Sequence, residues 1–283
     1  MKTLHVQNYN YTQSNSFKGY HPHEYKKGST SGLLIHESYF YREPITDSFV
    51  ENYILTHIKS DRKMNVVSAG CSAGEELYSI AAKLDYIQDR LNLEGFDLSE
   101  EIINEAKNGI YELTRYEDYF INDSANVEHR AQFYKYFLPV RYKQVGNFYK
   151  MREDAFPNCK FFTGDVSDID KYYEKDSVDV LLFRNVLYHL TCDFGDDLSQ
   201  RNKKENSSQI TNSLAQKMAS VVRKEGLVVL GEDDYFEGGA TKEFESAMLQ
   251  NGFEPVYLRS SAMYQKNFNP EIHAKTHVYK KVS

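Results

Sequence analysis

Tryptophan is absent from the sequence, cysteine occurs only three times and there is no long run of apolar residues. Cys71, Cys159 and Cys192 are odd in number and far apart, which argues against a disulfide scaffold and against a structural zinc site. No stretch approaches the roughly 18 apolar residues of a membrane span, and the first residues lack the apolar core of a signal peptide. These absences predict a cytoplasmic protein with no membrane insertion and no metal site.

Positive charge is also scarce, because 34 Lys and Arg against 41 Asp and Glu give a net charge of −7 at pH 7. Such a balance lacks the broad positive field that attracts nucleic acid, so no nucleic-acid partner is expected. What the chain does have is 283 residues, 41% of them hydrophobic, which is enough to bury a full core. Tyrosine and phenylalanine supply all of the 14% aromatic content.

The first 35 residues differ from the rest of the chain. They are rich in Asn, Ser, Tyr, Lys and Gly, show neither helical nor strand periodicity, and hold four lysines and one glutamate, a net charge of +3. We therefore expect a flexible N-terminal arm over residues 1–35 and one large domain over residues 36–283.

Strands alternate with helices from about residue 45 onward. Short apolar strands are predicted at 65–69, 93–97, 160–163, 178–183 and 227–231. The helices include one that Thr46 or Asp47 caps, one that Ser99 caps and Gly109 ends, and one at about 210–224. This alternation predicts an α/β fold with a doubly wound parallel sheet that helices cover on both faces.

Three segments do not follow the alternation. Residues 130–152 mix aromatic and basic side chains, with Gly146 and Asn147 at a turn, and predict a small antiparallel insert of two or three strands. Residues 191–208 are polar and without period, so we predict a surface loop. Residues 253–258 and 273–282 are predicted to be strands, the second as an antiparallel hairpin that closes the sheet edge.

The first predicted strand runs into SAGCSAGEE, residues 68–76. Gly70 and Gly74 permit a tight turn, and the helix that follows offers free N–H groups to a ligand. Asp97 ends the next strand 23 residues after Gly74, near the spacing at which an acid accepts ribose hydroxyls. The pattern predicts a nucleoside-bearing cofactor, although a plain strand-to-helix turn accounts for two glycines equally well.

Two acidic residues in this loop bear on which cofactor it binds. Glu75 and Glu76 would repel a pyrophosphate but suit a cation, and a sulfonium with an α-amino group is one. A dehydrogenase that binds a dinucleotide is therefore the less favoured alternative. Asp97 has a competing structural role as a helix cap, which Ser99 fills better.

Five segments, in order, resemble the successive motifs of the chemotaxis-receptor methyltransferase (CheR-type) family: SYFYR (38–42), SAGCSAGEELYSIA (68–81), FDLSEEIINEAKNGIY (96–111), LLFRNVLYHL (181–190) and GLVVLGED (226–233). The insert at about 130–152 falls where that family carries a small β-subdomain. The resemblance implies a Rossmann-like methyltransferase sheet with an antiparallel last strand. It also implies methyl transfer from S-adenosylmethionine to a glutamate of a partner protein, such as a chemoreceptor-like signalling protein.

The resemblance also implies the residues of the site. It places Arg42 beside the transferred methyl group and the incoming carboxylate, and Arg184 under the substrate. His189 stands where the family has a tyrosine, with Tyr188 one residue earlier, and which of the two takes that role stays open. The residues expected to line the cofactor are His36, Ser38, Arg42, Ala69, Gly70, Glu75, Glu76, Asp97, Asp165, Val166, Phe183, Arg184 and Asn185.

Methylation of a glutamate fits the side chains that are present. The carboxylate is already ionised at neutral pH, so it attacks the methyl carbon without a general base. The protein must supply alignment and positive charge, and the guanidinium groups of Arg42 and Arg184 match a carboxylate. The alternatives are a methyltransferase for a small molecule or another carboxylate, and a non-catalytic signalling module that binds S-adenosylmethionine.

Overall fold

The structure is a computed structural model that describes residues 38–41, 44–59, 61–113, 121, 127–140, 148–194, 201–231, 241–256 and 278–283. The arm at residues 1–35 lies outside these ranges, as do His36 and Arg42, so the boundary at residue 36 stays a prediction. Among the residues that the structure describes, no helix is both long and apolar enough to cross a membrane.

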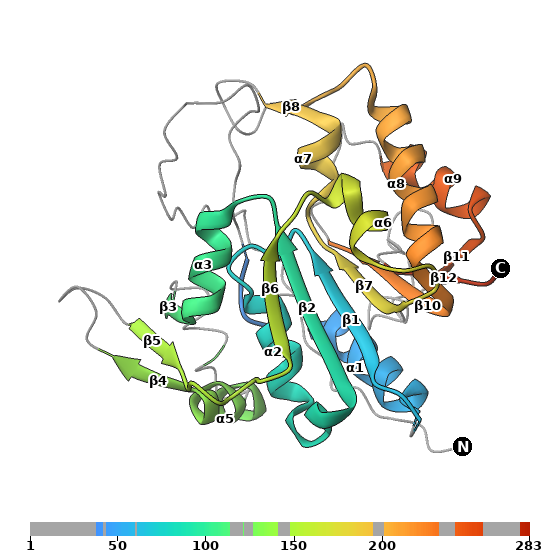
Figure 1. The fold of residues 1–283 in the computed structure, drawn as a ribbon. Helices are drawn as coiled ribbons and strands as arrows, with labels where there is room; N and C mark the ends of the chain where they lie inside the picture. Colours follow the sequence, from blue (N-terminus) through green and yellow to red (C-terminus); the bar gives the residue numbers. More distant parts are fainter. Residues whose placement is uncertain are drawn as a thin grey trace, which may run out of the picture.

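A seven-stranded sheet in the order β11-β12-β10-β7-β1-β2-β6 forms the centre of the molecule (Figure 1). Its strands are β1 (Met64–Ala69), β2 (Leu91–Asp97), β6 (Cys159–Thr163), β7 (Val178–Phe183), β10 (Val222–Leu230), β11 (Phe253–Val256) and β12 (Val278–Lys281). The strands from β10 to β6 are parallel, whereas β12 is antiparallel to both β10 and β11. This confirms the doubly wound α/β sheet with an antiparallel last strand.

Helices cover both faces of the sheet. One face packs α1 (Pro44–His57), α2 (Glu75–Lys83) and α3 (Glu100–Asn108), and the other packs α8 (Ser207–Val221) and α9 (Thr241–Gln250). Successive side chains of a strand point to opposite faces of the sheet. In β1, Val66 packs in the hydrophobic cluster under α1, α2 and α3, and Val67 packs in the cluster under α8 and α9. The short elements are η1 (Asp85–Arg90), η3 (Val166–Asp168), α6 (Ile169–Tyr172) and α7 (Leu187–Thr191).

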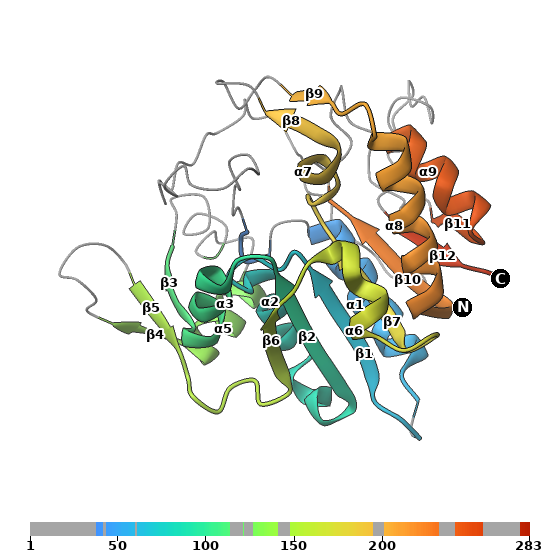
Figure 2. The same cartoon turned by 45° about the horizontal axis from the view of Figure 1, so that its top comes forward.

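The order of the strands places a ligand site between β1 and β7. The chain runs outward from β1 through β2 to β6, and then crosses to β7 and β10 on the other side of β1. Figure 2 shows α7 beyond the carboxyl ends of these strands. Open α/β sheets bind ligands at such a reversal of strand order.

Local signals account for the ends of α3. The Ser99 hydroxyl accepts the Ile102 N–H at 3.3 Å, and Gly109 ends the helix in the left-handed conformation (φ 59°), as predicted. The start of α1 was predicted wrongly, because the helix begins at Pro44 and Asp47 lies in its first turn instead of capping it. Proline suits a first helical position.

The antiparallel insert is confirmed in part. Strands β3 (Ile110–Glu112), β4 (Phe137–Val140) and β5 (Phe148–Met151) form a small antiparallel sheet in the order β3-β5-β4. The strand prediction is wrong over α5 (Val127–Tyr136), where Phe133 and Tyr136 are three residues apart and both buried, which is a helical spacing. The predicted turn at 146–147 lies outside the described residues.

Two further predictions need correction. Residues 191–208 are not a loop throughout, because β8 (Cys192–Phe194) pairs antiparallel with β9 (Arg201–Lys203), and α8 runs over 207–221 instead of 210–224. Near the C-terminus, β12 lies between β10 and β11, so β11 forms the sheet edge. The backbone bond from Lys204 N–H to the Thr191 carbonyl (2.8 Å) closes the base of the β8–β9 hairpin.

Candidate cofactor and active site

The loop between β1 and α2 is fixed to the neighbouring strand. The N–H groups of Gly70 and Cys71 both donate to the carbonyl of Phe96 at the end of β2, at 2.8 and 3.0 Å. Gly70 has a φ of 74°, and a Cβ on it would lie 2.5 Å from a methyl carbon of Val186. Glycine is therefore required at this position, and it brings the loop into contact with the segment after β7.

Asp97 is held in a defined orientation at the end of β2. Its two carboxylate oxygens accept the N–H groups of Ser72 (3.0 Å) and Ser99 (3.1 Å), and the residue is 8% exposed. The first bond joins Asp97 to the glycine loop, and the second joins it to the start of α3. The acid predicted for the ribose and the loop predicted for the cofactor therefore form one unit.

Arg184, Asp47 and Glu76 form a buried ionic cluster, the Arg184 charge group. The Nη1 atom of Arg184 donates to Asp47 Oδ1 at 2.7 Å, and its Nε atom forms an ion pair with Glu76 Oε1. The hydroxyl of Ser68 donates to Glu76 Oε2 at 2.9 Å. None of these four residues is more than 8% exposed. The group joins α1, β1, α2 and the end of β7 at the predicted site.

The motif that precedes Arg42 packs against the same region. The N–H of Tyr41 donates to the Ser79 hydroxyl on α2 (3.1 Å), and Ser79 donates to the Glu75 carbonyl (2.7 Å). Phe40 is 1% exposed and makes edge-to-face contacts with rings of α5 and of the small sheet. Ser38 is partly buried, while His36 and Arg42 lie outside the described residues.

Asn185 shapes the segment after β7. It has a φ of 58°, a left-handed conformation that asparagine tolerates better than most residues. Its side chain fills the space where Gly231, after β10, would have a Cβ: that atom would lie 1.8 Å from Asn185 Oδ1. Phe183 is fully buried and stacks on Phe244 of α9, so it supports the site from the core.

The predicted adenine and tyrosine positions lie on the surrounding loops. Asp165 caps η3 by accepting the Ser167 N–H (2.8 Å), and Val166 is 7% exposed in the core below it. On α7, Tyr188 is buried and its ring centroid lies 4.1 Å from that of the partly buried His189. The structure therefore places both candidates for the tyrosine role in the first turn after Asn185.

Two supports of the site were not found from the sequence. Asp47 was interpreted as a helix cap, yet it pairs with Arg184, 137 residues away. Tyr111 of β3 donates its hydroxyl to the Ala73 carbonyl at 2.7 Å and so supports the glycine loop. Burial raises the pKa of the Tyr111 hydroxyl well above its ordinary value, so it stays a donor.

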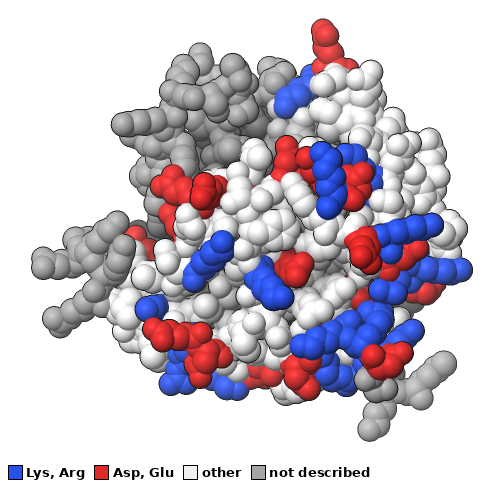
Figure 3. Space-filling view, in the orientation of Figure 1, with Lys and Arg blue, Asp and Glu red and all other residues white. Residues whose placement is uncertain are grey.

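The Cys71 thiol in the glycine loop lies among the acidic side chains of the site. Burial raises the pKa of the Cys71 thiol, and the charges of Asp97, Glu75 and Glu76 raise it further. The three carboxylates therefore all lie near the Cys71 side chain. On the face shown in Figure 3, acidic and basic side chains are intermixed, and acidic ones gather over the first turn of α3.

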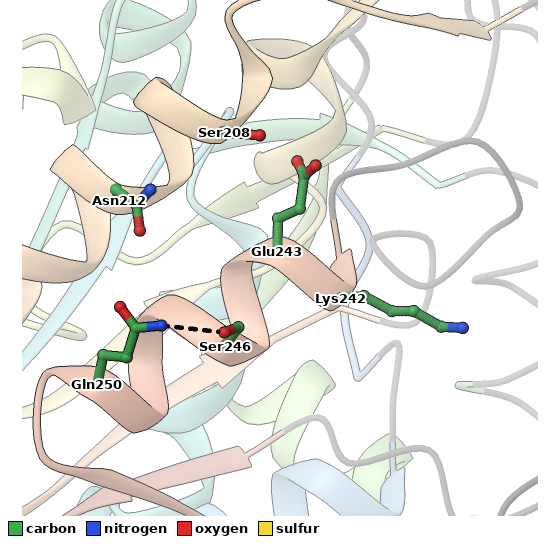
Figure 4. Close-up of a pocket in the computed structure, with 6 residues that line it drawn as sticks. All are labelled: Ser208, Asn212, Lys242, Glu243, Ser246 and Gln250. Carbon is green, nitrogen blue, oxygen red and sulfur yellow. Dashed lines mark hydrogen bonds between the residues drawn. The ribbon is translucent and has the colours of Figure 1, made fainter.

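A surface groove lies elsewhere, between α8 and α9 (Figure 4). It measures about 330 Å³ and has a polar lining of Ser208, Asn212, Lys242, Glu243, Ser246 and Gln250. None of these residues belongs to the site described above. Within the described ranges, no three His, Cys, Asp or Glu side chains are grouped so as to hold a metal ion.

Comparison with known proteins decides the family. The family model described as "CheR methyltransferase, SAM binding domain" matches residues 36–253. The chain belongs to this family. Its cofactor is accordingly S-adenosylmethionine, and its sheet is the Rossmann-like methyltransferase sheet.

The curated relatives are distant in sequence. The chemotaxis protein methyltransferase of Borreliella burgdorferi is 25% identical over 230 residues, which cover 75% of this chain and 69% of that protein. The protein of the same name from Campylobacter jejuni subsp. jejuni serotype O:23/36 is 28% identical over 167 residues, which cover 58% of this chain and 56% of that protein. Among solved structures, the CurJ carbon methyltransferase is 11% identical with a TM-score of 0.46, covering 84% of this chain and 54% of that one.

Proposed function

We propose that this member of the CheR family transfers the methyl group of S-adenosylmethionine to a glutamate side chain of a partner protein. The products are a glutamate methyl ester and S-adenosylhomocysteine. The observation that carries the proposal is the convergence of the glycine loop, Asp97 and the Arg184 charge group at the reversal of strand order. The relatives named chemotaxis protein methyltransferases support a chemoreceptor-like partner.

In this proposal, different described residues bind different parts of the cofactor. Glu76, held by Ser68 and Arg184, faces the methionine end with Glu75 beside it. Asp97 accepts the ribose hydroxyls, and Asp165 and Val166 border the adenine. Fixed carboxylates at the edge of the loop fit a ligand that carries positive charge.

The two arginines have different roles. The guanidinium of Arg184 is engaged by two carboxylates, so it orients Glu76. Arg42 directly follows Tyr41, whose backbone is bonded to α2 beside Glu75 and Glu76. We therefore assign Arg42 to the incoming carboxylate, which its planar fork can hold by two hydrogen bonds.

Catalysis then depends on alignment. S-adenosylmethionine supplies the methyl group, whose carbon bonds to the acceptor oxygen as its bond to sulfur breaks. The glutamate is ionised at neutral pH and the sulfur leaves as a neutral thioether, so no proton is gained or lost. The chain must hold the acceptor oxygen in line, about 3 to 3.5 Å from the methyl carbon. Ala69 and Gly70 at the end of β1 and Asn185 after β7 form the floor beneath that position.

The test is to incubate the protein with methyl-labelled S-adenosylmethionine and either receptor fragments or free carboxylic acids. We expect label on a receptor fragment that mild base releases as methanol, because methyl esters are base-labile. Labelling of free acids only would indicate a small-molecule methyltransferase. Binding of S-adenosylmethionine without transfer to any acceptor, together with a cellular output that Arg42→Ala leaves intact, would indicate a non-catalytic module.

A further inference from the structure

The glycine loop between β1 and α2 has a strained backbone. Gly70, Ser72 and Gly74 have φ angles of 74°, 50° and 88°, so three of the five residues 70–74 are left-handed. Glycine adopts this region freely, but a serine does so at a cost. A residue in such a conformation persists only where the surrounding structure holds it there. The loop therefore depends on hydrogen bonds that other elements make to its N–H and carbonyl groups.

Tyr111 supplies one of these hydrogen bonds from β3, outside the main sheet. The N–H groups of residues 70–72 donate to Phe96 and Asp97 at the end of β2. Tyr111 binds the second half of the loop instead, where its hydroxyl donates to the Ala73 carbonyl at 2.7 Å. The two halves of the loop are therefore held by different parts of the molecule.

The ring of Tyr111 also contacts the segment that leads to Arg42. Tyr111 is 6% exposed, and its ring lies edge-on to that of Phe40, with the centroids 5.1 Å apart. Phe40 is two residues before Arg42, and the residue between them, Tyr41, donates its N–H to Ser79 of α2. Tyr111 therefore joins the cofactor loop to the chain that precedes the arginine assigned to the acceptor.

We propose that Tyr111 is a positioning residue that holds the glycine loop in the conformation that binds S-adenosylmethionine. It acts through the Ala73 carbonyl, one residue before the N-cap of α2, and so fixes the backbone that leads to Glu75 and Glu76. Without the hydroxyl the loop populates other conformations, and the affinity for a ligand falls with the fraction that stays competent. The inference rests on the proposed placement of the cofactor at this loop.

The test is calorimetric titration of S-adenosylmethionine into wild type and Tyr111→Phe. Phenylalanine keeps the ring that contacts Phe40 and removes only the hydroxyl. We expect the Kd to rise about threefold to tenfold, the effect of one hydrogen bond. Amide hydrogen exchange over residues 68–81 without cofactor should also be faster in the variant, because the loop opens more often. A Kd within about twofold of wild type, or unchanged exchange over this segment, would overturn the proposal.

Tyr53→Phe is a matched control away from the site. Tyr53 is 9% exposed, and its hydroxyl also donates to a backbone carbonyl, that of Glu225, at 2.6 Å. The Kd should stay at the wild-type value in this variant, and an equal rise there would contradict the proposal.

Asp97→Ala separates this inference from the proposed function. If Asp97→Ala weakens binding of S-adenosylmethionine and Tyr111→Phe does not, only the role of Tyr111 is overturned. If wild type binds no S-adenosylmethionine, or if neither variant changes its affinity, the proposed placement of the cofactor at the glycine loop fails as well.

Discussion

The two ends of strand β7 carry ion clusters of opposite composition. At the amino end, the carboxylate of Asp179 accepts two hydrogen bonds from Arg62 (2.7 and 2.5 Å) and one from the Asn65 N–H (2.9 Å), with Arg223 3.4 Å away. At the carboxyl end, one guanidinium, that of Arg184, lies between two carboxylates.

The two clusters differ in their exposure to solvent. The arginines around Asp179 are 30% and 38% exposed, so water solvates their extra positive charge. The side chains of Arg184, Asp47 and Glu76 are at most 10% exposed, so water has little access to this cluster. The ion cluster at the amino end is therefore partly solvated, whereas the described residues of the cluster at the carboxyl end are enclosed.

The largest expected effect is on stability at the carboxyl end. Arg184→Ala leaves two buried carboxylates without their cation, and we expect the free energy of unfolding to fall by about 3 to 5 kcal/mol. Urea denaturation followed by circular dichroism measures it. Arg62→Ala should cost only about 1 kcal/mol, because Arg62 is partly exposed and Asp179 keeps the Asn65 N–H. Equal losses in the two variants would remove the distinction between the ends.

The next effect is on turnover. Arg42→Ala should lower the rate of methyl transfer about 100- to 1,000-fold, because it removes the cation proposed to hold the acceptor. Scintillation counting of transferred label measures the rate, and calorimetry should show cofactor affinity that changes far less. The matched variant Arg62→Ala, at the other end of the sheet, should transfer methyl at the wild-type rate. Full activity of Arg42→Ala would refute its assigned role.

A smaller effect is expected on cofactor affinity. Asp97→Ala removes the proposed ribose acceptor and should weaken S-adenosylmethionine binding by about 1 to 3 kcal/mol. Part of this loss comes from the loop, because Asp97 also accepts the Ser72 N–H. Asp97→Asn retains an acceptor oxygen and should therefore lose less than Asp97→Ala. Wild-type affinity in both variants would place the ribose elsewhere.

The smallest effect concerns the pH dependence of stability at Asp85, which starts η1 just before β2 and lies outside both clusters. Burial by itself raises the pKa of Asp85, but hydrogen bonds from Lys135 and Tyr136 outweigh it and lower the pKa below 3.8. The lowered pKa stabilises the fold above the ordinary carboxyl pKa, and this contribution is lost as the pH falls through the lowered value. Asp85→Asn should therefore be slightly less stable than wild type at pH 7 and equal to it in strong acid. A difference that grows in acid would contradict this assignment.

The sequence predicted those features of the fold that depend on residues close together in the chain. The run VDVLLF gave the bounds of β7, and Ser99 and Gly109 gave both ends of α3. The helix over 127–136 was missed because its aromatic residues fit two periods at once, and only their burial distinguishes a helix from a strand. The pairing of Asp47 with Arg184 was out of reach, because a contact between residues so far apart in the chain leaves no local pattern.

We propose that the carboxyl end of this sheet transfers methyl groups from S-adenosylmethionine to protein carboxylates. The most direct measurement is the release of labelled methanol by base from receptor fragments incubated with the protein and methyl-labelled S-adenosylmethionine. We expect base-labile label with wild type and Arg62→Ala, and a loss of about 100-fold or more with Arg42→Ala. Label that resists base, or equal labelling by Arg42→Ala, would contradict it.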